Sequence, residues 1–450
     1  METRSSRSDG FTVIEVVAAL SILVIALIGA ALLFENGIIV SGNTRNRVVA
    51  AQLASQAMEK IRGTAADPTK FTSITAGQTV SNQTVNGVQY TVTQDAQFVA
   101  QGSQQSTCDA PGNSSGYILA VNEKVTWTGM AGTNPVQQTT NLAAPVGAYN
   151  ASSGSIAVKV FDSNGAVAQN INIQISGPTS QTQQTTAEGC AFFAYLPVGT
   201  YTVSVIEGTG VGDQEVVAPA QTTSVSVGQT ASLQFNYDKP ATVAVTGWTG
   251  SAAPAASGIP ISVANTGLQL YGQYSYVAGT TTLAPLFPYA SGYTVFAGNC
   301  TDNNPLGKDT NRNPFYPSAA TTPLDVNPSQ TTPTAVNLYT VSVHVQTTVG
   351  VAVSGATMTA PETTSFPVPN SAVCTSGTAN GSAPTLGLVT TDASGNSITA
   401  LPLGHWTIKA HSGTKNGQVN VWVKPDAVYA VDGNGNATAA FGGPITVVVS

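Results

Sequence analysis

The feature that most constrains this chain is a long apolar run near its start. Residues 11–34 contain Glu15 as their only charged residue. As a helix, these 24 residues are about 36 Å long, which is enough to cross a hydrocarbon core of roughly 30 Å. Arg4 and Arg7 precede the run, which favours a cytoplasmic N-terminus and an exported remainder. We therefore expect one membrane-spanning helix followed by a chain that lies outside the cytoplasmic membrane.

The helical pattern continues beyond the apolar run. Residues 36–62 contain no proline, and apolar side chains recur at roughly helical spacing, among them Val49, Leu53 and Ile61. Gly63 and then Pro68 are suitable stops. The sequence predicts one helix of some 50 residues over 11–62, apolar in its first half and amphipathic in its second.

The opening of this helix resembles a known family. The segment GFTVIEVVAALSILVIALIGA is similar to the class III signal and N-terminal helix of type IV prepilins and pseudopilins. The resemblance implies that a prepilin peptidase removes the leader 1–10 by cutting between Gly10 and Phe11, and that Phe11 is then N-methylated. Glu15 becomes the fifth residue of the mature chain, and the resemblance implies that it meets the amino terminus of an adjacent subunit. Many major pilins have proline where this chain has Leu32, so their helix break is not implied here.

The chemistry of Glu15 agrees with an assembly contact. An unpaired carboxylate in hydrocarbon costs several kcal/mol, so it needs a partner or must be neutral. The freed amino group of Phe11 on a neighbouring helix would supply that partner. The alternative is a signal anchor whose Glu15 reaches the membrane surface. That alternative leaves Gly10, Phe11 and the long second half of the helix unexplained.

Composition points to extracellular β-structure for the remainder. Charged residues make up only 8% of the chain, against a usual value of about 25%. Its 450 residues suffice for about three or four domains. A formal net charge of −7 argues against nucleic-acid binding, which needs clustered Lys and Arg.

Residues 63–147 read as short strands joined by polar turns. The segments NGVQYTVTQDAQFVA and GYILAVNEKVTWTG alternate β-forming residues. We expect a pilin-like β-meander packed on the outer half of the helix, with Trp127 as a packing residue. The VTWTG strand and the exit TTNLAAP resemble those of minor pilins and pseudopilins.

The chain beyond residue 147 repeats one scheme three times. The segments are YLPVGTYTVSV (195–205), LFPYASGYTVFAG (286–298) and ALPLGHWTIKA (400–410). Each has an apolar pair with proline, a glycine, an aromatic residue and an alternating strand. We predict three antiparallel β-sandwiches over 148–239, 240–338 and 339–450.

The repeated hairpin resembles the carboxypeptidase-regulatory-like, or transthyretin-like, sandwich. In that fold the glycine permits a tight turn and the aromatic residue is buried. Tyr201, Tyr293 and Trp406 are therefore expected in the cores. The overall fold class is mainly β with one long N-terminal α-helix, namely a pilin-like helix and β-meander followed by three Ig-like or transthyretin-like sandwiches.

The four cysteines fit disulfides better than a metal site. Cys108, Cys190, Cys300 and Cys374 form no C-x-x-C pair. Three connectivities are open for two disulfides. Cys190 and Cys300 lie on equivalent strands of adjacent repeats, which favours a bond between them and leaves Cys108 to Cys374.

No pattern indicates catalysis or a cofactor. No nucleophile elbow, Walker loop or H-E-x-x-H motif is present, and we expect the three histidines (His344, His405, His411) on strand surfaces. Asp309 and Asp432 begin D-x-N-x-N segments, but these lack the downstream glutamate of an EF-hand, so turns are expected rather than metal sites.

Together these features predict a minor type IV pilin that is not an enzyme. Its expected partners are the prepilin peptidase, other pilin subunits, the inner-membrane assembly platform and a surface or host ligand. It would lie in the cytoplasmic membrane before assembly and on the pilus or cell surface afterwards. The alternatives are a pseudopilin-like part of a type II secretion or DNA-uptake machine, and an anchored surface protein that never polymerises.

Overall fold

A computed structural model describes most of the chain from residue 12 to residue 450. The gaps are 72–73, 75–76, 101–107, 109–116, 131–133, 146–151, 270–271, 276–280, 309–311, 318–320, 363–383 and 434. Gly10, Phe11, Asp309 and Cys374 therefore lie outside the described residues, and the predictions that concern them remain predictions.

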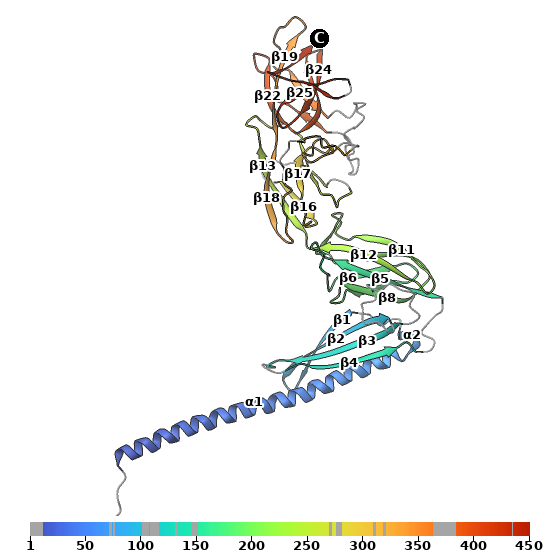
Figure 1. Cartoon of the computed structure of the whole chain (residues 1–450), viewed down its shortest axis with the longest axis vertical. Helices are drawn as coiled ribbons and strands as arrows, with labels where there is room; N and C mark the ends of the chain where they lie inside the picture. Colours follow the sequence, from blue (N-terminus) through green and yellow to red (C-terminus); the bar gives the residue numbers. More distant parts are fainter. Residues whose placement is uncertain are drawn as a thin grey trace, which may run out of the picture.

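The described chain is mainly β, with one apolar N-terminal helix and several β-sheets (Figure 1). Helix α1 spans Val13–Ala65 without interruption, which confirms the predicted long helix. It passes through Leu32 without a break. A short helix α2, Pro68–Phe71, follows directly.

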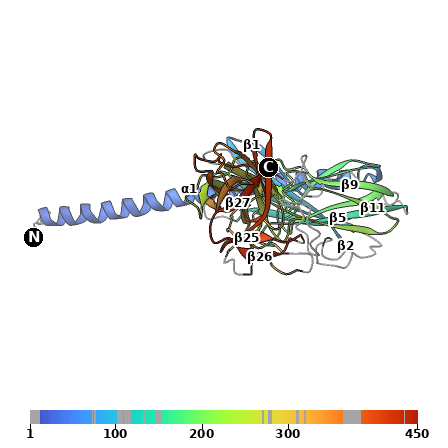
Figure 2. The same ribbon diagram turned by 90° about the horizontal axis from the view of Figure 1, so that it is seen from above.

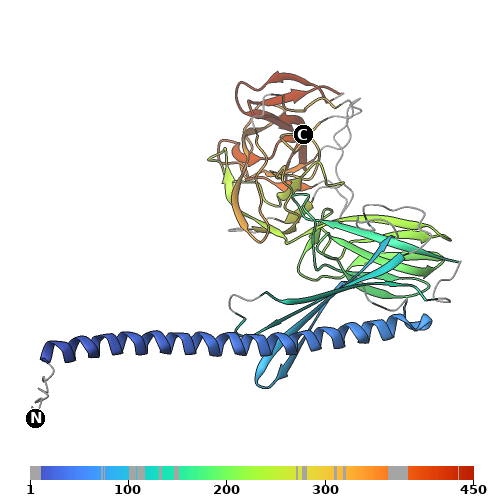
Figure 3. The same ribbon diagram turned by 60° about the horizontal axis from the view of Figure 1, so that its bottom comes forward.

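Four strands form an antiparallel meander in which each strand pairs with the next in sequence. They are β1 (Gly77–Val85), β2 (Val88–Ala100), β3 (Tyr117–Trp127) and β4 (Val136–Ala143). The second half of α1 lies along this sheet, as Figure 3 shows, with its contacts to β2, β3 and β4.

The remaining strands form three units that share one topology. In each unit the first strand pairs with the fourth and the last, and the second strand pairs with the third and the fifth. The first unit contains β5 (Ser153–Phe161), β6 (Asn172–Ser176), β7 (Gln181–Gln184), β8 (Cys190–Pro197), β9 (Gly199–Val205), β10 (Val211–Gly212), β11 (Ala220–Val225) and β12 (Thr230–Asp238). The second contains β13 (Ala241–Thr249), β14 (Pro260–Ala264), β15 (Gly272–Ser275), β16 (Thr281–Leu286), β17 (Thr294–Ala297) and β18 (Thr331–Asn337). The third contains β19 (Tyr339–Thr347), β20 (Thr357–Pro361), β21 (Thr385–Gly387), β22 (Asn396–Leu401), β23 (Gly404–Ser412), β24 (Lys415–Val423), β25 (Val428–Val431), β26 (Ala437–Ala440) and β27 (Ile445–Val449).

The units are not purely antiparallel, which corrects the prediction. β5 pairs in parallel with β12, β13 with β18, and β19 with β27. Parallel neighbours need a crossover rather than a tight hairpin, and the strands of the opposite sheet provide it. Alternation within single strands carries no information about this pairing.

The cores of the units differ in how far they extend. The first unit encloses its own cluster between its two sheets, including Ile156, Ile173 and Phe193. A single cluster runs through the second and third units, from Ala241 to Val449. One residue, the buried Leu338, separates β18 from β19, so these two units are joined by a continuous core.

The aromatic residue of each repeated hairpin is buried, as predicted. Tyr201, Tyr293 and Trp406 are all 0% exposed. The Tyr201 hydroxyl donates to the Pro197 carbonyl at 3.0 Å, and the Trp406 indole N–H donates to the Pro402 carbonyl at 3.1 Å. The ring therefore fills the core while its polar atom closes the preceding turn.

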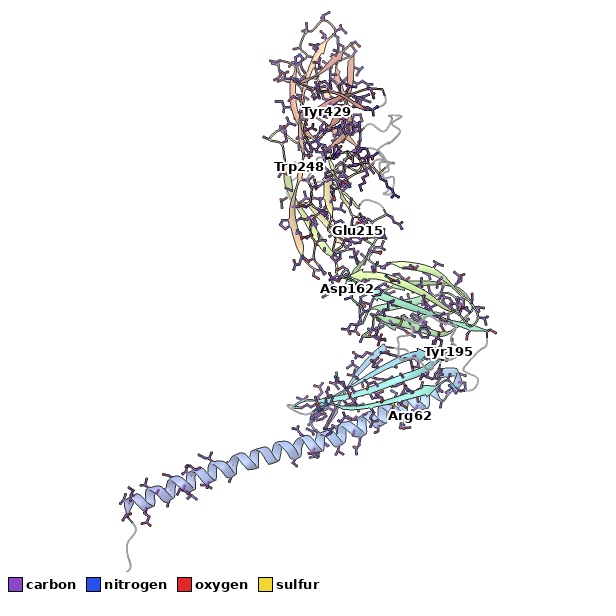
Figure 4. The ribbon with its side chains drawn as sticks, viewed as in Figure 1. Arg62, Asp162, Tyr195, Glu215, Trp248 and Tyr429 are labelled. Carbon is purple, nitrogen blue, oxygen red and sulfur yellow. A yellow bond between two sulfur atoms is a disulfide. The ribbon has the colours of Figure 1, made fainter. Side chains whose placement is uncertain are left out.

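The described disulfide joins Cys108 to Cys190, so the favoured pairing of Cys190 with Cys300 is wrong. Cys190 begins β8, and its side chain belongs to a cluster with Phe98 and Phe192 at the contact between the meander and the first unit. Its strand faces the meander rather than the second unit, and sequence position alone does not reveal that orientation. Figure 4 places Tyr195 at the same contact, where its ring lies 5.9 Å from that of Phe71.

Replacing both Cys108 and Cys190 with serine should lower the stability of this contact. The bond closes a loop with a sequence separation of 82 residues. The loop-closure model then gives a loss of about 4.5 kcal/mol in the free energy of unfolding. Denaturant titration of the full chain in detergent measures this loss. Non-reducing peptide mapping is the independent check, because a peptide linking Cys108 to any other cysteine would contradict the assignment.

Candidate assembly site

The first part of α1 has no cover within the described chain. Val13–Ala31 is long and apolar enough to span a membrane, and none of it is buried. Side chains such as Ile14, Ile22 and Ile25 are at least 68% exposed. Figure 2 shows this part of the helix projecting away from the β-sheets. An apolar surface of this size requires lipid or other helices around it.

Glu15 lies in the first turn of α1 and is exposed. The backbone N–H of Glu15 donates to the Thr12 carbonyl, which begins the helix. A carboxylate at this end interacts favourably with the helix dipole. The structure thus places Glu15 at the outer end of the apolar helix, where a neighbouring molecule can reach it.

The second half of α1 is covered by the meander through two apolar clusters. The first contains Ala50, Leu53 and Ala54 of the helix, which pack against strand residues that include Val125 and Trp127. Trp127 is 5% exposed, so the prediction that it is a packing residue is confirmed. The second cluster contains Met58, Ile61 and Ala65 of the helix and extends to Phe192 of the first unit.

A row of polar side chains crosses the sheet between these two clusters. The register pairs Thr79 with Gln94, Gln94 with Glu123, and Glu123 with Gln138. Opposite residues of paired strands point to the same face, so the four side chains face α1. Gln138 donates to Ser55 of the helix at 3.0 Å. The other three line a cavity of about 290 Å³ between the helix and β1–β3.

Glu123 is a buried carboxylate that the sequence analysis missed. It is 0% exposed, and neither carboxylate oxygen has a hydrogen-bond partner among the described residues. Burial raises the pKa of Glu123 from its ordinary 4.5 to about 7. The sequence already indicated that Glu123 faces inward, because it alternates in phase with Val121 and Val125 on β3.

Replacing Glu123 with glutamine should make the protein more stable at alkaline pH. The folded-state pKa is above the unfolded value, so the folded state holds the proton more tightly and the free energy of unfolding falls as pH rises from 4.5 to about 7. Glutamine cannot ionise, so Glu123→Gln escapes this fall. Its gain over the natural chain should be about 3 kcal/mol at pH 8 and small at pH 4.5, at about 1.4 kcal/mol per pKa unit.

Thermal and denaturant unfolding between pH 4.5 and pH 8 would measure this gain. Glu59→Gln is the matched control, because Glu59 lies on α1 with its side chain 69% exposed. A stability difference between Glu123→Gln and the natural chain that is the same at both pH values would show that Glu123 is not held neutral by burial.

A second polar group is buried where the second and third units meet. Asp302 accepts hydrogen bonds from the backbone N–H of His405 at 3.0 Å and pairs with its Nδ1 at 2.9 Å. The Asn303 amide donates to Glu362 at 2.6 Å and to the Leu403 carbonyl at 2.8 Å. His405 is only 6% exposed, so its expected position on a strand surface is wrong. The residue is inward because Asp302 reaches it from the preceding unit.

This group does not assemble a metal site from the described residues. Ligand atoms of Cys300, Asp302 and Glu362 lie within 4.8 Å of one another. Cys300 is disulfide-bonded and offers no thiolate. Burial, and then the charge of Asp302, raises the pKa of Glu362 well above its ordinary range. Asp432 accepts hydrogen bonds from Asn436, as expected of a turn between β25 and β26.

Comparisons with known proteins do not assign a family. No family model matches the chain, and no curated protein matches it. Among solved structures, the TIE protein of Bacillus anthracis aligns over 83% of this chain and 73% of its own length, with 12% identity and a TM-score of 0.20. A streptococcal ancillary pilin aligns over 48% of this chain and 75% of its own, with 11% identity and a TM-score of 0.18. The major pilin SpaD of Corynebacterium diphtheriae aligns over 66% and 96%, with 12% identity and a TM-score of 0.19.

Proposed function

We propose that this chain is a minor type IV pilin. A prepilin peptidase cuts between Gly10 and Phe11, Phe11 becomes N-methylated, and α1 then assembles with other pilin subunits on the inner-membrane platform. Before assembly, the chain is a single-pass protein of the cytoplasmic membrane. Afterwards it displays the three β-units on the pilus or cell surface, where they contact a surface or host ligand. We propose no catalytic role and no cofactor.

The observation that carries this proposal is the division of α1 into two parts. One helix of 53 residues begins with an exposed apolar half and ends with a half that is packed on a four-stranded meander. The helix is thus presented to neighbours at one end and fixed to the rest of the protein at the other. Glu15 stands in the first turn of the exposed half, where the sequence pattern requires it.

The bulk of the chain after the helix supports a tip or sparse position. In a filament of packed helices, neighbouring helices lie roughly 10 Å apart, which is about the diameter of one helix with its side chains. The described strands extend from Gly77 to Val449, which is too much material to repeat at every step. A pseudopilin-like part of a secretion or DNA-uptake machine is the second candidate, because the same N-terminus serves both.

Replacing Gly10 with leucine should abolish removal of the leader. The peptidase requires a small residue before the cut in the family that this N-terminus resembles. N-terminal sequencing of the membrane-bound protein should find Phe11 first in the natural chain and Met1 in the variant. Processing that is unchanged by Gly10→Leu would contradict both the pilin and the pseudopilin proposals and favour a plain membrane anchor.

Replacing Glu15 with alanine should leave processing intact and reduce incorporation into filaments. The variant loses the carboxylate that pairs with the amino group of a neighbour, and a pairing worth about 1.4 kcal/mol changes occupancy about tenfold. Quantitative blotting of sheared filaments against the membrane fraction measures the effect. Glu59→Gln is the control, because Glu59 lies on the half of α1 that contacts the meander. Equal incorporation of all three chains would remove Glu15 from assembly.

A further inference from the structure

The three repeated units differ at one strand position. In the first unit, β9 carries the aromatic residue of the repeated hairpin, and β11 pairs with β9 along its outer edge over Ala220–Val225. In the third unit, β24 pairs in the same way with β23 over Lys415–Val423. In the second unit the equivalent strand is β17, and it is the last strand of its sheet within the described residues. The first and third units fill this position with their own chain, and no described residues of the second unit form a strand there.

Only a single pair remains of the missing strand. Tyr293 and Leu324 form an isolated antiparallel bridge, in which each backbone N–H donates to the carbonyl of the other. In the first unit, the corresponding Tyr201 pairs with Thr223 within a ladder that continues along β9. Beyond Tyr293, no described residue continues this ladder along β17.

The reason is that the chain leaves β17 toward the third unit. Gly298 turns the backbone with a φ of +101°, and Asn303 and Asp302 are then held by Leu403 and His405. Both side chains are about 1% exposed. The chain that directly follows β17 is therefore fixed against the third unit by buried hydrogen bonds.

A cavity of about 460 Å³ lies at the vacant position. One wall is β17, the other is the end of β18, and Thr322, Leu324 and Tyr339 contribute to the remainder. Ala335 of β18 lines this cavity and is otherwise exposed. The cavity is thus a groove bounded on one side by an edge strand.

The backbone of β17 is oriented for pairing in this groove. Tyr293 uses its N–H and C=O on the outer edge, and backbone groups of a strand alternate between its two edges. The N–H and C=O groups of Val295 and Ala297 therefore also face the outer edge. No hydrogen bond to another element occupies that edge at these two residues in the described chain. An edge strand beside a groove is the arrangement that accepts an added strand.

We propose that the second unit binds an extended segment of another polypeptide as an added strand, antiparallel to β17. The ligand is an uncharged stretch rich in β-branched residues, because the same position in the first unit is taken by AQTTSV of β11. Its backbone bonds Val295 and Ala297, and its side chains contact Leu324, Ala335 and Tyr339. This site lies far from α1 in sequence and does not depend on the proposed assembly.

The probe for this site is an acetylated and amidated peptide of sequence AQTTSVSV, residues 220–227 of this chain. Full-length protein in detergent is titrated with the labelled peptide, and binding is followed by fluorescence polarisation. We expect saturable binding to the natural chain. Ala335→Trp fills the groove from an exposed position and should weaken binding about tenfold or more, which is a change of about 1.4 kcal/mol. Ala335→Ser is the matched control and should bind as the natural chain does.

Two further arms locate the peptide. A photoreactive residue at its centre should cross-link to residues 293–297 or 334–337, and a proline at its fourth position should abolish binding because it removes a backbone donor. Thr322→Trp fills the same groove from the segment next to Leu324. It replaces Ala335→Trp if the Ala335→Trp variant melts at a lower temperature than the natural chain. The proposal is overturned by an absence of saturable binding, by equal binding to the blocked variant or to the proline peptide, or by cross-links in the first or third unit.

Discussion

The packing of the second half of α1 on the meander is the contact on which the rest of the structure depends. The described chain buries none of the apolar helix surface over Val13–Ala31, so packing within the chain does not stabilise that part of α1. The cover begins near Ala50, and the same cluster of residues that holds Met58 and Ile61 continues into Phe192 of the first unit. The first unit is therefore attached to the helix through one apolar cluster, to which the Cys108–Cys190 disulfide adds a covalent link.

The joints along the chain use different chemistry. The joint between the meander and the first unit is aromatic, with the rings of Tyr117 and Phe192 only 4.6 Å apart. The joint between the first and second units is a polar loop contact, in which Gln214 donates to the Gly267 carbonyl at 2.8 Å. Burial there raises the pKa of Glu215, which Figure 4 labels, to about 7.

The joint between the second and third units combines a shared core with the Asp302 and Asn303 hydrogen bonds. Buried hydrogen bonds of this kind favour one arrangement over others, because any shift leaves a polar group unpaired.

The parts of the fold that could be predicted are those that repeat along the chain. Helical periodicity defined α1 to within a few residues, and the repeated hairpin identified Tyr201, Tyr293 and Trp406 as core residues. Features that depend on which surfaces of two separate units pack together could not be predicted from the sequence. The pairing of Cys108 with Cys190 follows from the docking of β8 on the meander, and the burial of His405 follows from Asp302 reaching across units. Glu123 is the exception, since its alternation with Val121 already placed it on the inner face.

A repeated topology also makes a departure in one copy informative. In the first and third units the chain forms a strand beside the one that carries the buried aromatic residue, namely β11 beside β9 and β24 beside β23. The second unit forgoes that strand, and its chain instead makes the buried bonds of Asp302 and Asn303 with the third unit. Within the described residues, the backbone of Val295 and Ala297 has no partner on the outer edge of β17, so an added strand from another polypeptide would complete the sheet at that edge.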